Sequence, residues 1–114
     1  MAVNVEAVNQ VVREFAADVS RELPVDKVIL YGSYAKGNAS EQSDIDICFF
    51  LKDYNGKRRV DLLTQILGIG GKKYRGAFFE PIIFETAEIQ NDNPFIREIL
   101  ATGKEIIDLS AAVD

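Results

Sequence analysis

A run of apolar residues near the middle of the chain constrains the fold more than any other segment. Every position from Ile47 to Leu51 is apolar, so both faces of an extended strand would be apolar there. Such a strand is stable only when protein covers both of its faces. We therefore predict a central strand over residues 44–51 that is covered on both faces. Asp44 and Asp46 at its beginning are charged, unlike the rest of the strand, and we look for a function that explains them.

Helices and short strands alternate along the rest of the chain. The apolar spacing predicts helices over 4–22, 57–67 and 93–103 and strands over 28–31, 77–84 and 104–109. Pro81 cannot donate to a ladder, so its strand should lie at a sheet edge or carry a bulge. The glycines between 68 and 71 should end the middle helix, and a basic loop should follow over 72–75.

Composition narrows the function classes. The 114 residues suit one domain over 1–114, and 47% hydrophobic residues can build a core. A net charge of -5 argues against strong nucleic-acid binding. The chain has no histidine, which excludes histidine-based catalysis. The single Cys48 and the lack of a membrane-length apolar run lead us to expect a cytoplasmic protein.

The two aspartates that open the central strand predict a metal site. Residues i and i+2 of a strand point to the same side, so Asp44 and Asp46 should aim two negative charges at one spot. Like charges that close repel each other unless a cation lies between them or one takes up a proton. Mg²⁺ prefers oxygen ligands and substrate phosphates, so one or two Mg²⁺ ions are the expected cofactor.

A small-residue turn precedes this pair and predicts a phosphate site. Glycine allows a sharp turn and close approach of a ligand, so Gly32 and Ser33 could present backbone N–H groups and a hydroxyl to an anion. Gly37 would let the chain return to the central strand, and Lys36 could add a positive charge. A phosphate-binding turn beside a metal-binding carboxylate pair is the arrangement that nucleotidyl transfer requires.

A third carboxylate would complete a two-metal site or act as the base for an acceptor hydroxyl. Glu80 and Glu85 are the candidates, and they face opposite ways in a regular strand because they are five residues apart. We favour Glu80, which lies near the start of the third predicted strand. Glu85 is expected to be a solvated residue that leads into the next turn.

These motifs resemble a known family. Gly32-Ser33 through Gly37, followed by Ser43-Asp44-Ile45-Asp46, is similar to the Gly-Ser … Gly … Ser-Asp-x-Asp signature of the nucleotidyltransferase superfamily that includes DNA polymerase β. At this length the chain resembles the minimal nucleotidyltransferase (MNT) proteins, over nearly all of its residues. The resemblance implies an α/β (α+β) fold, a small mixed β-sheet with helices mainly on one face.

The resemblance also implies the ligands and the roles of the residues. It implies Mg²⁺ and a nucleoside triphosphate, commonly ATP. Gly32 and Ser33 match the phosphate-binding positions, and Lys36 and Ser43 are taken as further nucleotide-binding residues. The metal-ligand and catalytic positions are matched by Asp44, Asp46 and Glu80. The third position is usually aspartate in this family, so Glu80 departs from the pattern.

Minimal members are often encoded beside a HEPN-domain protein, which in characterised pairs is a toxin that the MNT protein adenylylates. The resemblance thus implies transfer of AMP from ATP to a hydroxyl of a HEPN partner by an antitoxin. One alternative is a binding module that neutralises the HEPN partner by contact alone. Another is a small-molecule transferase of the aminoglycoside-modifying type. Apolar positions on the first and last helices could also form a homo-oligomer.

Overall fold

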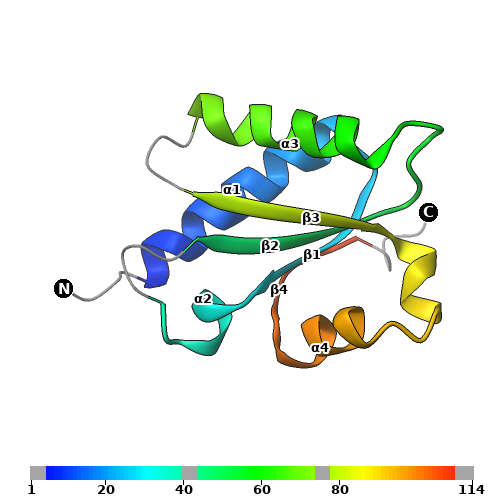
Figure 1. Cartoon of the computed structure of the whole chain (residues 1–114). Coiled ribbons are helices and arrows are strands. Elements are labelled where there is room, and N and C mark those ends of the chain that lie inside the picture. Colours follow the sequence, from blue (N-terminus) through cyan, green and yellow to red (C-terminus); the bar gives the residue numbers. More distant parts are fainter. Residues whose placement is uncertain (1–4, 40–43, 74–77, 110–114) are drawn as a thin grey trace.

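The computed structural model describes residues 5–39, 44–73 and 78–109 (Figure 1). Its elements are α1 (Val5–Glu22), β1 (Val25–Tyr31), α2 (Ser33–Lys36), β2 (Ile45–Leu51), α3 (Arg59–Lys73), β3 (Phe79–Glu85), the 3-10 helix η1 (Thr86–Gln90), α4 (Pro94–Thr102) and β4 (Lys104–Asp108). None of the helices in these ranges is long and apolar enough to cross a lipid bilayer.

The strands form one mixed sheet in the order β3-β2-β1-β4. β1 pairs antiparallel with both β2 and β4, whereas β2 pairs parallel with β3. β2 is therefore an inner strand, as its apolar sequence predicts. β3 lies at an edge of the sheet, which confirms the prediction from Pro81.

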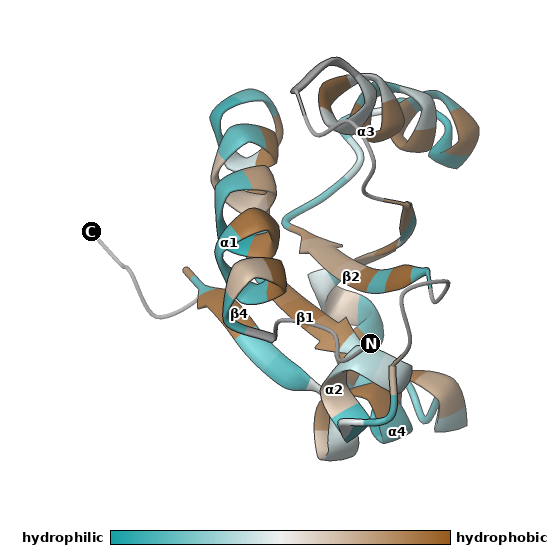
Figure 2. Cartoon of the chain, turned by 90° about the vertical axis from the view of Figure 1, so that its left-hand side faces the viewer, coloured by the Kyte–Doolittle hydropathy of each residue, from teal (hydrophilic) through white to brown (hydrophobic). Residues whose placement is uncertain are grey.

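The alternation of side chains along the inner strands divides the core between the two faces of the sheet. Phe49 packs with α1 and α3 on one face, while Cys48 and Phe50 pack with α4 on the other. Figure 2 shows this arrangement from the end of the sheet where α2 lies, with the hydrophobic side of α1 turned toward the strands. The two long helices thus share one face, and α4 covers the other (Figure 1).

Aromatic rings fix α1 to the sheet. The Phe15 ring on α1 stacks on Phe79 with centroids 4.1 Å apart and meets Phe49 edge-on at 5.8 Å. Phe15 and Phe49 are fully buried. Burial of one such side chain contributes about 1.5–3 kcal/mol to folding. These contacts hold β2 and the beginning of β3 beneath the helical layer.

The glycines of α3 do not end the helix, so that prediction was wrong. α3 continues through Gly68, Gly70 and Gly71 to Lys73. Packing explains the result, because a Cβ atom at Gly70 would lie 3.1 Å from both the Phe15 and Phe79 rings. Gly70 therefore allows close contact between α3 and these rings. Residues 72 and 73, which we expected in a basic loop, therefore belong to α3. The other residues of that expected loop, 74–75, lie outside the described part.

The start of α4 follows the sequence closely. The Asn93 side-chain oxygen accepts hydrogen bonds from the backbone N–H groups of Phe95 at 2.9 Å and Ile96 at 3.3 Å. Pro94 occupies the first turn, where its missing N–H has no partner to lose. Ile96 and Ile99 then lie buried against the sheet.

Candidate active site

A tight turn joins β1 to the short helix α2. Gly32 has φ 73° and ψ −149°, a conformation that residues with a Cβ rarely adopt. Its carbonyl accepts the Lys36 N–H at 3.1 Å and closes one helical turn. Gly37, at φ 80°, ends that turn in the left-handed conformation. The expected bend between Gly32 and Gly37 is thus present as a single helical turn.

Gly32 packs directly on Asp46. A Cβ atom built at Gly32 would lie 2.2 Å from the Asp46 Oδ2 atom, well inside van der Waals contact. No other residue could bring the backbone so close to this carboxylate without movement. The glycine therefore serves two purposes, since it permits the positive φ and leaves room for the carboxylate.

Three polar side chains form a row across the sheet. In the strand register Tyr31 of β1 lies opposite Asp46 of β2, which in turn lies opposite Glu80 of β3. The pleat places Asp46 and Glu80 on the same face of the sheet as Cys48 and Ile82. Asp44 precedes β2 by one residue and is exposed. The sheet thus brings together carboxylates that are far apart in the sequence.

The electrostatics show that these carboxylates affect one another. Burial raises the pKa of Asp46, and the negative charges of Glu80 and Asp44 raise it further. Tyr31 responds in the same way: burial first, then the charges of Asp46, Cys48 and Glu80, raise its pKa to about 12. At neutral pH Tyr31 therefore keeps its proton and can donate a hydrogen bond.

The carboxylates suit Mg²⁺ by their chemistry. Asp44, Asp46 and Glu80 offer only oxygen ligands, which Mg²⁺ prefers. Their mutual repulsion is the kind that a cation relieves. Within the ranges that the structure describes, no three acidic side chains are grouped tightly enough to hold a metal ion by themselves. Mg²⁺ is usually bound through one or two carboxylates together with substrate phosphates, and two aspartates meet that requirement.

The structure separates the two candidates for the third carboxylate. Glu80 meets Asp46 across the sheet, whereas Glu85 lies at the other end of β3. The Glu85 carboxylate accepts the Tyr54 N–H at 3.1 Å and caps η1 together with Glu88. Glu85 is therefore half-buried and hydrogen-bonded rather than the solvated residue that we expected.

The other predicted nucleotide-binding residues belong to the turn or lie outside the described part. Ser33 is the half-buried first residue of α2, and Lys36 is exposed in its last position. Ser43 lies outside the described residues. Sequence reasoning missed Tyr31, because an aromatic residue at the end of an apolar strand resembles a core residue. The position of Tyr31 directly before Gly32 is the sequence feature that could have indicated its nearness to the site.

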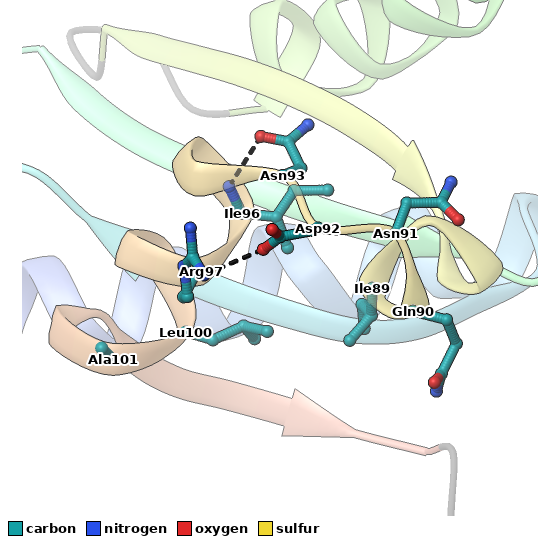
Figure 3. A pocket seen from close by; sticks show the side chains of 9 residues that line it. All are labelled: Ile89, Gln90, Asn91, Asp92, Asn93, Ile96, Arg97, Leu100 and Ala101. Carbon is teal, nitrogen blue, oxygen red and sulfur yellow. Dashed lines mark hydrogen bonds and ion pairs between the residues drawn. The ribbon is translucent and has the colours of Figure 1, made fainter.

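Among the described residues, some cavities lie beside this row of side chains and others lie farther from it. One of about 300 Å³ is lined by Asp44, Glu80 and the end of α3. Another of about 270 Å³ continues from Glu80 along the outer side of β3. A third of about 480 Å³ lies between η1 and α4, where Arg97 pairs with Asp92 at 2.8 Å, and none of the predicted site residues lines it (Figure 3).

Comparison with known proteins gives matches along most of the chain. The family model described as "Polymerase beta, Nucleotidyltransferase" matches residues 15–111. A Methanocaldococcus jannaschii protein named "Putative protein adenylyltransferase" is 30% identical over 99 residues, covering 85% of this chain and 96% of that protein. A second protein of the same organism and description is 35% identical over 106 residues, covering 87% and 70%.

Two solved structures have a similar fold. One is described as a "putative nucleotidyltransferase" from Sulfolobus solfataricus, with a TM-score of 0.60, 23% identity, and coverage of 75% of this chain and 74% of that chain. The other is described as a toxin-antitoxin with AMP-PNP, with a TM-score of 0.55, 16% identity, and coverage of 84% and 73%. At these identities the likeness is one of fold.

Proposed function

The chain belongs to the polymerase β nucleotidyltransferase family, and on that premise we propose that it transfers AMP from ATP to a hydroxyl group of a partner protein. The observation that carries this proposal is the contact between Gly32 and Asp46, within a row that also includes Glu80. This contact brings a turn suited to phosphate against carboxylates suited to Mg²⁺. Neither group alone would support nucleotidyl transfer.

In the proposed site the turn holds the phosphates. The backbone N–H groups that follow Gly32 and the Ser33 hydroxyl donate hydrogen bonds to phosphate oxygens, and Lys36 adds a positive charge. Ser43 is assigned to the same group of nucleotide contacts. The single turn would hold the triphosphate beside Asp46, so positioning supplies much of the rate enhancement.

Asp44 and Asp46 are the residues that would hold Mg²⁺, with Glu80 as the third carboxylate. The bound ion would neutralise charge on the triphosphate and make the α-phosphorus more electrophilic. Glu80 accepts the proton of the acceptor hydroxyl as its oxygen bonds to the α-phosphorus. The bond from that phosphorus to pyrophosphate breaks, so the products are an adenylylated hydroxyl and pyrophosphate.

A protein acceptor is supported by the relatives and the fold. The curated relatives are named protein adenylyltransferases, and one structure of similar fold is a toxin-antitoxin with AMP-PNP. We propose that this chain is the antitoxin of such a pair in the cytoplasm, with a HEPN-domain protein as its acceptor. The HEPN assignment rests on the resemblance of the signature to minimal nucleotidyltransferases.

A second candidate is neutralisation of the toxin by contact without chemistry. One observation favours it: the described carboxylates do not form a three-ligand cluster by themselves. Glu80 in place of the usual aspartate points the same way. This candidate uses the same partner but requires neither ATP nor Mg²⁺.

Label transfer separates the two candidates. The chain is incubated with Mg²⁺, its genomic neighbour and ATP labelled at either the α- or the γ-phosphate. We expect label on the partner from the α-position only, and none with the double variant Asp44→Asn/Asp46→Asn. Asp53→Asn, at the opposite end of β2, is the matched control and should retain transfer. Suppression of toxicity by the double variant without any label would favour contact alone.

A further inference from the structure

The order of the site residues across the sheet bears on the direction from which an acceptor would approach. Asp46 lies between the Gly32 turn on the β1 side and Glu80 on the β3 side. In an in-line displacement the attacking and leaving oxygens lie on opposite sides of the phosphorus. If the turn holds the leaving pyrophosphate, as the proposed function states, the acceptor must arrive from β3.

A groove lies on that side of the sheet. The cavities of about 300 and 270 Å³ share Leu67, Phe79 and Glu80, so they are parts of one depression. The first reaches Asp44, and the second reaches Pro81 and Ile82. The groove therefore runs from the carboxylates along the outer side of β3, beneath α3. We call it the α3–β3 groove.

The walls of the α3–β3 groove are unusually apolar for a surface. Leu67 is 50% exposed and Phe78 is 67% exposed, although both are large hydrophobic residues. Exposed apolar groups gathered beside a site commonly mark a binding surface. Among the residues whose side chains the structure describes, Asp44 and Glu80 are the charged ones that line the two cavities, and both are acidic. The apolar walls suit a ligand with apolar groups, and these two acidic side chains suit one that is neutral or basic beside them.

β3 adds a second feature that suits an extended chain. It is an edge strand, paired with β2 along one side, and in the described part of the chain its other side forms no ladder. The open side of an edge strand presents backbone groups that another extended segment can use. Apolar pockets beside such an edge would then select the side chains of that segment.

We propose that the α3–β3 groove binds an extended segment of the acceptor protein, in which apolar residues flank the hydroxyl that receives AMP. This inference rests on the proposed function and specifies its acceptor. The hydroxyl residue lies at Glu80, and the flanking apolar side chains contact Leu67, Phe78 and Phe79. A single-stranded nucleic acid is the competing occupant, and the net charge of -5 disfavours it.

Peptide binding tests this proposal without requiring catalysis. Fluorescent decapeptides carry a central Tyr, Ser or Thr flanked either by Leu and Val or by Ser and Asp. Their binding is measured by anisotropy in the presence of Mg²⁺ and AMP-PNP, with a single-stranded DNA oligonucleotide as competitor. We expect binding of apolar-flanked peptides only, and about tenfold weaker binding with Leu67→Ser or Phe78→Ser. Val60→Ser, at a 57% exposed apolar residue of α3 outside the groove, is the matched control and should bind like wild type.

Three results would overturn the groove as the acceptor site: no preference for apolar flanks, equal affinity in the Leu67 and Phe78 variants, or displacement of the peptide by DNA. Nucleotide binding is followed separately, as the rise in Tm caused by Mg²⁺ and AMP-PNP. That rise should persist in all three variants. Loss of peptide preference with an intact rise contradicts the groove alone, whereas peptide preference without any rise contradicts the proposed function alone.

Discussion

At the scale of single residues, Asp46 carries an unfavourable electrostatic conflict. Its carboxylate is packed against Gly32 and lies opposite Glu80, and its pKa is raised by burial and by two neighbouring negative charges. A carboxylate that is harder to ionise in the folded protein than in the unfolded chain destabilises the fold at neutral pH. Functional sites commonly retain such a conflict because the ligand relieves it.

Asp46→Asn should therefore stabilise the protein without ligand. The side chain is only half-buried and solvent screens the neighbouring charges, so we expect a gain of less than about 1 kcal/mol, or up to about 5 °C in Tm. Because the folded pKa is raised, the penalty is absent below the ordinary value of 3.8 and grows as pH rises through the raised value. The difference in Tm between variant and wild type should thus be full at pH 7 and close as the pH falls through that window. Asp53→Asn should show no comparable gain in Tm at pH 7. An equal gain in Tm for both variants would mean that burial and charge repulsion at Asp46 are not the cause.

Gly32→Ala tests the contact between the turn and the carboxylate. The new Cβ would strain the backbone at φ 73° and collide with Asp46 Oδ2. We expect a loss of about 1–3 kcal/mol from backbone strain at this positive φ and at least about 100-fold lower nucleotidyl transfer. Gly56→Ala shares the positive φ, at 78°, but its Cβ would meet open space. It should lose similar stability and retain activity; equal losses of activity would contradict a specific role for Gly32.

The part of the candidate site that lies within one segment follows from local sequence rules, whereas the part that depends on pairing between distant strands does not. The spacing of Asp44 and Asp46 places them together on any strand. The choice between Glu80 and Glu85 depends on which end of β3 lies beside the acidic start of β2, and this is set by a long-range pairing. The sequence did not predict Tyr31 as a site residue for a similar reason. Tyr31 lies near Glu80 only because β1 pairs with β2 and β2 pairs with β3.

At the scale of elements, α3 shows how packing overrides propensity. Glycine favours the end of a helix when judged alone. In α3 the helix nevertheless continues through Gly70, where the missing Cβ leaves room for the Phe15 and Phe79 rings. This contact joins residues that are widely separated in sequence, so no local pattern could predict it.

Two glycines of α3 provide a matched test. A Cβ at Gly68 would meet open space, so Gly68→Ala should stabilise the helix by about 0.5–1 kcal/mol. Gly70→Ala would push against two aromatic rings at 3.1 Å and should destabilise by about 1–3 kcal/mol. Urea denaturation of both variants measures the difference. If both substitutions stabilise equally, Gly70 does not have the packing role assigned to it.

At the scale of the whole molecule, the sheet order converts distant motifs into one site. The apolar run over 47–51 predicts that β2 is central, and Pro81 predicts that β3 lies at an edge. The parallel pairing of β2 with β3 could not be derived from periodicity, because it depends on the connection through α3. That pairing places Glu80 beside Asp46 and opens the groove on the far side of β3.

Nucleotide binding should stabilise the whole fold. A ligand that binds only the native state at 100 times its Kd raises the free energy of unfolding by about 2.7 kcal/mol. We therefore expect Mg²⁺ and AMP-PNP together to raise the Tm of wild type, and either one alone to raise it less. Asp44→Asn/Asp46→Asn should abolish the combined effect. An equal rise in the double variant would place the nucleotide at another site.

The central claim is that the Gly32 turn and the two aspartates together hold a metal-bound nucleotide, and a crystal structure with Mn²⁺ and AMP-PNP tests it most directly. Anomalous scattering locates the Mn²⁺ ion independently of the protein atoms. The expected result is an anomalous peak coordinated by Asp44 and Asp46, with the triphosphate on the residues from Gly32 to Lys36. A peak and nucleotide elsewhere, for instance in the cavity between η1 and α4, would contradict the account.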